Sequence, residues 1–232
     1  MRDLAARGVH VYGYNRSGAG ARAANDAGFD ASDDLADTLR RAEEDKALIV
    51  MAAPMPAIPG MLDAIVDHAP SCGFTDVVSV KAEVYALVKE RGLQDRYVGG
   101  HPMAGTADSG WSASQEGLFT RAAWVITYDH APDASDEWIA LWTDVVRMIL
   151  AVGADAIPAR VDHHDAAVAR ISHVVHVFAE VLAIVGDNGG ALAQSLAAGS
   201  FRDSTRVAGT QPSLVRAMCE TNADAVVVAL DE

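Results

Sequence analysis

Short apolar runs alternate with longer amphipathic segments over the first two-thirds of the chain. The apolar runs predict strands at residues 9–14, 47–52, 76–80, 97–100 and 123–128. Helical patterns separate them, at residues 19–27, 33–44, 54–68, 82–91 and 136–152. The run at 47–52 is apolar throughout, as in a strand of a parallel sheet that helices cover on both faces. Repeated strand–helix units of this kind predict a doubly wound α/β sheet.

The pattern changes after Pro158, where the strands stop and helical segments continue. Residues 166–185 are apolar on most of their circumference, which is typical of a helix buried inside a bundle. Residues 213–230 predict a further helix. We therefore expect two domains, a Rossmann-like dinucleotide-binding domain at residues 1–160 and an all-helical domain at residues 161–232.

The chain is acidic, because 18 Lys and Arg residues stand against 32 Asp and Glu residues and give a net charge of -14. Such a surface repels phosphate backbones and anionic lipid head groups, so we expect neither a nucleic-acid partner nor a membrane partner. An anionic ligand must then be bound by a few local cations or by helix N-termini.

Features that would place the chain outside the cytoplasm are not predicted. No stretch approaches the ~20 apolar residues that cross a bilayer, and the longest, 145–157, is interrupted by Arg147, Gly153 and Asp155. The first residues lack the apolar core of a signal peptide, and two cysteines cannot form the disulfide framework of a small secreted domain. We therefore expect a soluble, cytoplasmic protein.

Asn15, Arg16 and Ser17 follow the first predicted strand. In a dinucleotide-binding fold the second strand ends beside the adenosine ribose, where an acidic residue binds the 2′-hydroxyl of NAD and an Arg accommodates the 2′-phosphate of NADP. The triplet therefore predicts NADP, with NAD as the alternative, although an ordinary polar turn also fits. Ala53 and Pro54 follow the buried strand, where a strand-to-helix turn of this kind lets a flat ligand lie close to the backbone.

His101 stands in the sequence Gly-Gly-His-Pro at the end of a predicted strand. Pro102 disfavours the α region for His101 and predicts an extended backbone there. Ligands of open α/β sheets bind at strand ends, and a neutral histidine can take up a proton at physiological pH, so His101 is a candidate general base. Ser79 ends the neighbouring predicted strand and could orient the imidazole. The alternative is a solvent-exposed loop histidine.

His173 and His176 lie three residues apart in the apolar helical segment and therefore share one face. They fit three interpretations: metal ligands together with Glu180, a core pair satisfied by hydrogen bonds, or a polar stripe facing the cleft between domains. The HExxH pattern and a further ligand set are missing, so we expect no metal. Arg206 could clamp a substrate carboxylate or belong to the charged surface.

Four motifs occur in order along nearly the whole chain. They are Ser79-Val80-Lys81, His101 to Thr106 (HPMAGT), His164-Asp165 with Ser172 to His176 (SHVVH), and Ser204 to Ala208 (STRVA). Together they resemble the prephenate/arogenate dehydrogenase family of tyrosine biosynthesis. The resemblance implies NAD(P)-dependent oxidative decarboxylation of prephenate to 4-hydroxyphenylpyruvate, and a homodimer joined through the helical domain.

The resemblance also implies roles for single residues. His101 would accept the proton of the ring hydroxyl while hydride leaves the ring for the nicotinamide and the ring carboxylate departs as carbon dioxide. Ser79 would position His101. The implied substrate-binding residues are Arg206, His173, His176 and Thr106.

The chain departs from the family pattern at both ends. It begins on a helix tail, without the first strand and the Gly-rich turn whose N–H groups bind the pyrophosphate, and it ends inside an apolar helical pattern. We therefore expect this chain by itself to bind cofactor weakly. The alternatives are arogenate dehydrogenase, an NADP-dependent imine or hydroxyacid reductase with the same layout, and a catalytically silent, dimerising remnant.

Overall fold

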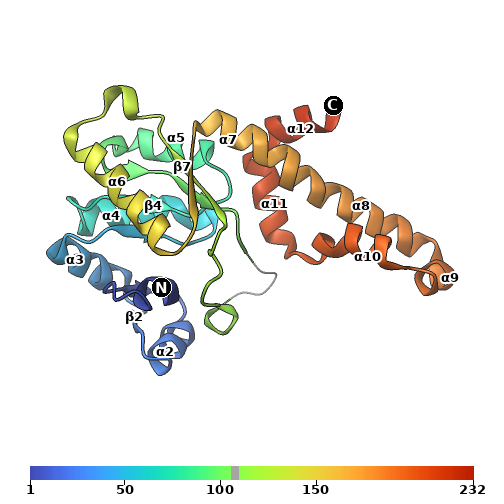
Figure 1. The fold of residues 1–232 in the computed structure, drawn as a ribbon, viewed down its shortest axis with the longest axis horizontal. Helices are drawn as coiled ribbons and strands as arrows, with labels where there is room; N and C mark the ends of the chain where they lie inside the picture. The colour runs from blue at the N-terminus through green and yellow to red at the C-terminus, as the bar shows by residue number, and fades with distance from the viewer. Residues whose placement is uncertain (106–109) are drawn as a thin grey trace. The chain divides into compact units, whose positions relative to one another are not determined.

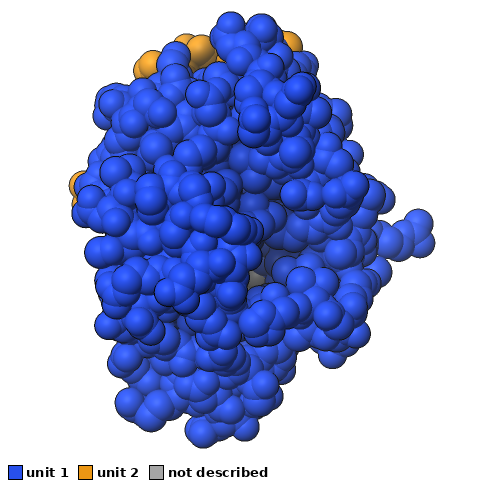
Figure 2. Space-filling model, turned by 90° about the vertical axis from the view of Figure 1, so that its left-hand side faces the viewer, with its two compact units in different colours: residues 1–161 blue, residues 162–232 orange. Residues whose placement is uncertain are grey.

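A computed structural model describes residues 1–105 and 110–232 of the chain (Figure 1). The chain divides into two compact units, Met1–Val161 (unit 1) and Asp162–Glu232 (unit 2), which Figure 2 shows in separate colours. Unit 1 carries the strands and unit 2 is built from helices.

Unit 1 alternates strands and helices. Its strands are β1 (Tyr12–Tyr14), β2 (Asp30–Ser32), β3 (Ile49–Met51), β4 (Phe74–Asp76), β5 (Tyr97–Val98), β6 (Gly100–Pro102), β7 (Ala123–Thr127) and β8 (Asp155–Ala159). Its α-helices are α1 (Arg2–Ala5), α2 (Gly18–Asp26), α3 (Leu35–Asp45), α4 (Ile58–His68), α5 (Ala82–Glu90) and α6 (Asp136–Ala151). Short 3-10 turns are η1 (Met55–Ala57), η2 (Gln94–Arg96), η3 (Trp111–Ala113) and η4 (Ala131–Asp133).

The strands pair mostly in parallel. β1 pairs with β2, and β3, β4 and β5 pair in that order, all in parallel. In a further sheet β7 lies between β6, to which it is antiparallel, and β8, to which it is parallel. Parallel strands joined by helices, followed by a helical unit, confirm the predicted fold class.

Two strands, β2 and β8, were not expected from the sequence. β2 is too polar to show an apolar run, and β8 contains Pro158, which the edge of a sheet tolerates because a missing N–H faces no partner there. The strand expected at 76–80 ends earlier, at Asp76. The reason is that the Asp76 carboxylate accepts the Val78 N–H at 2.8 Å and so turns the chain.

The strand expected at 97–100 is divided between two sheets at Gly99. β5 pairs with β4, whereas β6 pairs with β7. A Cβ on Gly99 would lie 2.7 Å from the Thr127 hydroxyl oxygen, so only glycine fits where the strand changes partner. As a result His101 lies within a strand and not after one.

Two apolar clusters hold the strands of unit 1 in place. One joins α3, α4 and α5 to β3, β4 and β5, with Ile58, Leu62 and Phe74 fully buried. The other packs α6 on β7 through buried residues that include Trp124 and Ile149. Each such side chain stabilises the fold by roughly 1.5–3 kcal/mol through its burial. The first cluster thus holds β3, β4 and β5, and the second holds β7, the strand that pairs with β6.

Unit 2 starts within one long helical run. This run comprises α7 (Val161–Val168), the π-helical turn η5 (Ala169–His173) and α8 (Val174–Asn188). The elements that follow are α9 (Gly190–Ser195), α10 (Gly199–Thr205), η6 (Arg206–Gly209), α11 (Pro212–Thr221) and α12 (Ala223–Asp231). The single helix expected at 213–230 is therefore two helices, which meet at Asn222.

α8 is less buried than the sequence pattern predicts. Phe178, Ile184 and Val185 are exposed, although a helix this apolar was expected inside a bundle. By length and composition alone, the run Val161–Asn188 could cross a membrane, with 28% of its apolar window buried in the structure. The expectation that the chain holds no stretch of this kind is therefore wrong.

Candidate active site

His101 is held inside β6 and is 8% exposed. It stands opposite Val125 of β7 in the antiparallel register, and Pro102 continues the extended backbone, as the sequence predicts. A buried strand histidine does not fit the alternative of a solvent-exposed loop residue. Ser79 is half-buried in the turn between β4 and α5, and β4 lies against β6.

A buried network that the sequence did not predict adjoins these two residues. Lys81 and Asp76 are both fully buried and form an ion pair through Lys81 Nζ and Asp76 Oδ1. Lys81 Nζ also donates to the Gly100 carbonyl at 2.7 Å, and the Tyr97 hydroxyl donates to Asp76 Oδ2 at 2.5 Å. The only local feature of the sequence that points to this network is Lys81, which directly follows an apolar run. That feature does not identify the groups to which Lys81 binds.

Three of the candidate cofactor residues, Asn15, Arg16 and Ser17, lie at the start of α2. Asn15 Oδ1 accepts the Ser17 N–H at 2.9 Å, and the Ser17 hydroxyl caps the helix by accepting the Gly20 N–H at 3.4 Å. A Cβ on Gly20 would lie 2.6 Å from Asn15 Oδ1, so glycine is needed for this turn. Arg16 is exposed between them.

This turn has the chemistry of an anion site. Among the residues that the structure describes, Arg16 forms no ion pair, and the helix N-terminus beside it favours negative charge. The residues present therefore fit the adenosine-ribose end of NAD(P), with the Asp33 carboxylate beside the same turn, 2.7 Å from where a Cβ on Gly18 would lie. Ala53 is half-buried and Pro54 exposed at the turn between β3 and η1.

His173 is 1% exposed and belongs to a hydrogen-bonded network in unit 2. Asn222 Nδ2 donates to the Asp165 carbonyl at 2.9 Å and contacts His173 Nδ1 at 3.2 Å. Asp165 also accepts from His164 Nδ1 at 2.7 Å. Burial lowers the pKa of His173 from 6.5 to about 4, so its ring is neutral at physiological pH.

The remaining predicted site residues differ in their surroundings. His176 is half-buried one turn beyond His173, and its Nδ1 is a buried atom without a hydrogen bond among the described residues. Arg206 is exposed at the start of η6, which packs against α8. Thr106 lies outside the residues that the structure describes. Across the described ranges, no three potential ligand residues gather into a metal site.

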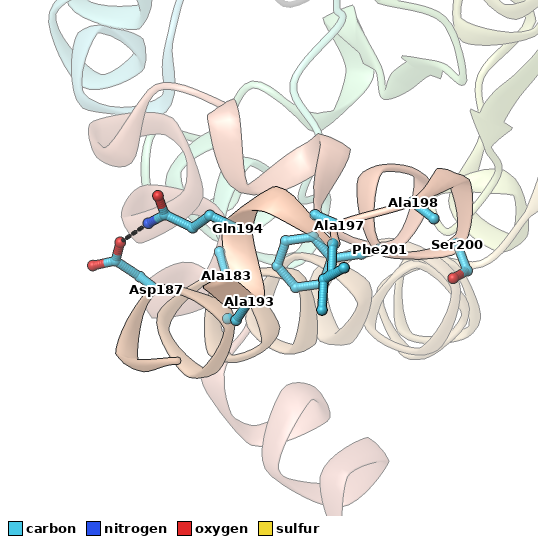
Figure 3. Close-up of a pocket in the computed structure, with 10 residues that line it drawn as sticks. Ala183, Asp187, Ala193, Gln194, Ala197, Ala198, Ser200 and Phe201 are labelled. Atoms are coloured by element: carbon cyan, nitrogen blue, oxygen red, sulfur yellow. Dashed lines mark hydrogen bonds between the residues drawn. The ribbon is translucent and has the colours of Figure 1, made fainter. Parts of the chain in front are cut away.

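A hollow in unit 2 lies away from these candidates. It has a volume of about 420 Å³ and is lined from α8, α9 and α10, with Phe201 projecting into it (Figure 3). Gln194 donates to Asp187 at 2.7 Å on its rim, and four of the ten lining residues are alanines. It contains none of the residues that the sequence singled out for chemistry.

Comparisons with known proteins assign each of the two units to a known domain family. Residues 1–155 match the model of the prephenate dehydrogenase nucleotide-binding domain, and residues 160–232 match that of the prephenate dehydrogenase dimerization domain. The chain belongs to the prephenate dehydrogenase family. Within this family, unit 1 corresponds to the nucleotide-binding domain and unit 2 to the dimerization domain.

Individual members of the prephenate dehydrogenase family agree with this assignment. Prephenate dehydrogenase of Bacillus subtilis is 30% identical over 209 residues, which cover 86% of this chain and 54% of the relative. The chain thus spans about half the length of that curated relative.

Solved structures give the same result. A Corynebacterium glutamicum structure, provisionally assigned as a prephenate dehydrogenase, is 63% identical with a TM-score of 0.98, covering 100% of this chain and 73% of the other. Synechocystis arogenate dehydrogenase is 30% identical with a TM-score of 0.76, covering 99% and 81%. Solved structures named for prephenate dehydrogenase and for arogenate dehydrogenase therefore share the fold of this chain.

Proposed function

We propose that the chain acts in an NADP-dependent prephenate dehydrogenase, which converts prephenate to 4-hydroxyphenylpyruvate by oxidative decarboxylation in tyrosine biosynthesis. The observation that carries the proposal is His101, buried in β6 beside the turn that bears Ser79, in a chain of this family. His101 and Ser79 are the two residues that we assign to catalysis.

His101 is assigned the role of base. Its extended, buried backbone holds the imidazole in one place, and a neutral imidazole nitrogen can accept the proton of the ring hydroxyl as the ring is oxidised. Ser79 is assigned to orient this ring. Bound NADP would supply the hydride acceptor. Aromatisation of the product drives the loss of carbon dioxide, so the protein needs mainly orientation, a base and anion binding.

The cofactor and substrate are assigned to local cations because the chain as a whole is strongly negative. Arg16, with Asn15 and Ser17, is assigned to the 2′-phosphate of NADP, and Ala53 and Pro54 to contacts with the cofactor. NAD remains the alternative cofactor. Arg206 is assigned to a substrate carboxylate. The residues assigned to line the rest of the substrate pocket are His173, His176 and Thr106.

We further propose that two copies of the chain form a homodimer through unit 2 and that the protein works in the cytoplasm, without a nucleic-acid or membrane partner. The support is the match of residues 160–232 to a dimerization domain, together with the exposed apolar face of α8. The net charge of -14 disfavours phosphate-rich partners.

Arogenate is the second candidate substrate. It shares the reacting ring with prephenate. Arogenate dehydrogenase of Synechocystis resembles this chain over 99% of the length of this chain.

Initial rates with prephenate and arogenate, each with NADP and NAD, test the proposal alongside His101→Asn. We expect turnover with prephenate and NADP, and a loss of about 10²–10⁴-fold in kcat for the variant, because a positioned base contributes that much. Binding of substrate should change little in the variant. Absence of turnover with every pair of substrate and cofactor, in protein shown to be folded and at cofactor concentrations that offset weak binding, would contradict the proposal and favour a catalytically silent remnant.

A further inference from the structure

The carbonyl group of Gly100 points away from the strand that pairs with β6. In an antiparallel pair, residues alternate between those that exchange hydrogen bonds with the partner strand and those that do not. The Thr127 N–H donates to the Gly99 carbonyl at 2.9 Å, and His101 stands opposite Val125 two residues along. Gly100 between them therefore directs its polar groups away from β7, towards β4.

Lys81 satisfies this carbonyl. The pairing of β4 with β5 covers Phe74 and Thr75 and does not extend to Asp76, so no strand ladder reaches Gly100 from that side. A Cβ on Gly100 would lie 2.7 Å from the Asp76 carbonyl oxygen, which shows that the two backbones pack directly on each other. Lys81 Nζ supplies the hydrogen bond at 2.7 Å. A buried carbonyl without a partner would otherwise be costly.

The same lysine also closes the turn that carries Ser79. Its ion pair with Asp76 joins the two ends of the segment 76–81, and Asp76 Oδ1 accepts the Val78 N–H at 2.8 Å within it. The Tyr97 hydroxyl donates to the other carboxylate oxygen. One buried ion pair therefore touches the backbone next to His101 and the turn around Ser79.

We propose that Lys81, held by Asp76, is a positioning residue that sets His101 and Ser79 relative to each other. The inference rests on the proposed function for its kinetic part only. Stability alone does not account for the pair, because replacing a fully buried ion pair by well-packed hydrophobic residues of similar volume is often neutral or stabilising. What a hydrophobic pair would not supply is a donor for the Gly100 carbonyl.

The test is the double variant Asp76→Asn with Lys81→Met, which removes both charges and leaves neither one unpaired. We expect kcat to fall about 10²-fold, because small misplacement of a catalytic group has effects of that size. The Kd for NADP should stay within a few-fold of the unmodified value, since residues 15–17 are untouched. Tyr97→Phe, which removes the hydroxyl that donates to Asp76 and leaves both charges in place, is the milder second variant, with an expected loss in kcat of about 2–10-fold.

Val88→Ala is the matched control, because Val88 is also fully buried on α5 but lies in the apolar cluster. It should lower the thermal midpoint and leave kcat unchanged where the protein is folded. NMR of the His101 ring gives a readout independent of turnover. We expect displaced ring resonances in the double variant and in Tyr97→Phe, but not in Val88→Ala.

Unchanged kcat together with unchanged His101 resonances in either folded network variant would overturn the proposal. If the unmodified protein turns over neither substrate, the proposed function fails. In that case the ring resonances still decide whether the Lys81–Asp76 pair positions His101.

Discussion

Asn222 lies 57 residues from Asp165 and 49 residues from His173 in the sequence, but the three residues share one buried network in unit 2. Because Asn222 Nδ2 donates to the Asp165 carbonyl, it must also act as the donor to His173 Nδ1. His173 Nδ1 is then the acceptor, and the ring proton sits on Nε2. Protonation of His173 would place two donors against each other, in keeping with the lowering of its pKa by burial.

This arrangement predicts a dependence of stability on pH. The pKa of His173 is 6.5 in the unfolded chain and about 4 in the folded one, so between these values the unfolded state binds more protons. The free energy of unfolding should therefore fall as the pH drops from 6.5 towards 4, by up to about 3 kcal/mol from this group.

Urea unfolding at a series of pH values measures this effect. His173→Gln should show a shallower fall in stability over that window than the unmodified protein. His163→Gln, an exposed neighbour on α7, is the control and should follow the unmodified curve. Equal slopes for His173→Gln and the unmodified protein would contradict the assignment.

At the scale of elements, the sequence predicts those helices and strands that have a clear apolar pattern of their own. The helices at 136–152 and 82–91 and the strand at 123–128 agree with α6, α5 and β7 to within one or two residues. β2 and β8 are missed because their pairing partners, not their own apolar pattern, make them strands.

The candidate site shows the same limit. His101 and Ser79 could be singled out locally, from a proline and from strand ends. The contacts of Lys81 with the Gly100 carbonyl and of Asn222 with the Asp165 carbonyl could not be predicted, because these partners lie 19 and 57 residues away in the chain. Contacts at such separations depend on tertiary packing, which a single sequence does not display.

The packing of α8 against α10 gives a prediction at this scale. A Cβ on Gly186 of α8 would overlap the Phe201 ring of α10, which Figure 3 shows at the hollow, whereas a Cβ on Gly60 of α4 would meet nothing within 4 Å. Gly186→Ala should therefore destabilise the protein by about 1–3 kcal/mol through overpacking. Gly60→Ala should stabilise it by about 0.5–1 kcal/mol, since alanine favours a helix.

Chemical denaturation of the two variants checks this contrast. Because both changes add the same methyl group within a helix, opposite signs isolate the contact with Phe201. A stabilising effect of Gly186→Ala would show that α10 does not pack on α8 in solution.

At the scale of the whole molecule, unit 2 leaves an apolar stripe uncovered. The exposed large hydrophobic residues of α8 are Val175, Phe178, Val181, Leu182, Ile184 and Val185. Contiguous apolar surface of this kind marks an interaction site, and residues 160–232 match a dimerization domain. The buried bundle helix expected from the sequence is accounted for if a second copy covers this stripe.

Ile184→Glu tests the assembly. Placing a charge in an apolar interface should weaken the dimer by at least about 10²-fold in Kd, because an unpaired charge resists burial. Ile139→Glu is matched in chemistry and exposure, at 53% against 61%, but lies on α6 of unit 1. Sedimentation velocity should show dissociation for Ile184→Glu alone, and an intact dimer in that variant would move the interface elsewhere.

The continuous helical run Val161–Asn188 contains several of the features described above. The Val161 N–H is anchored on Asp129 at 2.8 Å, the π-turn presents His173, and the apolar stripe follows. Since each residue of an α-helix advances the azimuth by about 100°, a single deletion would rotate every later side chain away from its partners. The angular positions of the histidines and of the apolar stripe around the helix axis therefore depend on each other. The π-helical turn, which contains one additional residue, sets the angle between them.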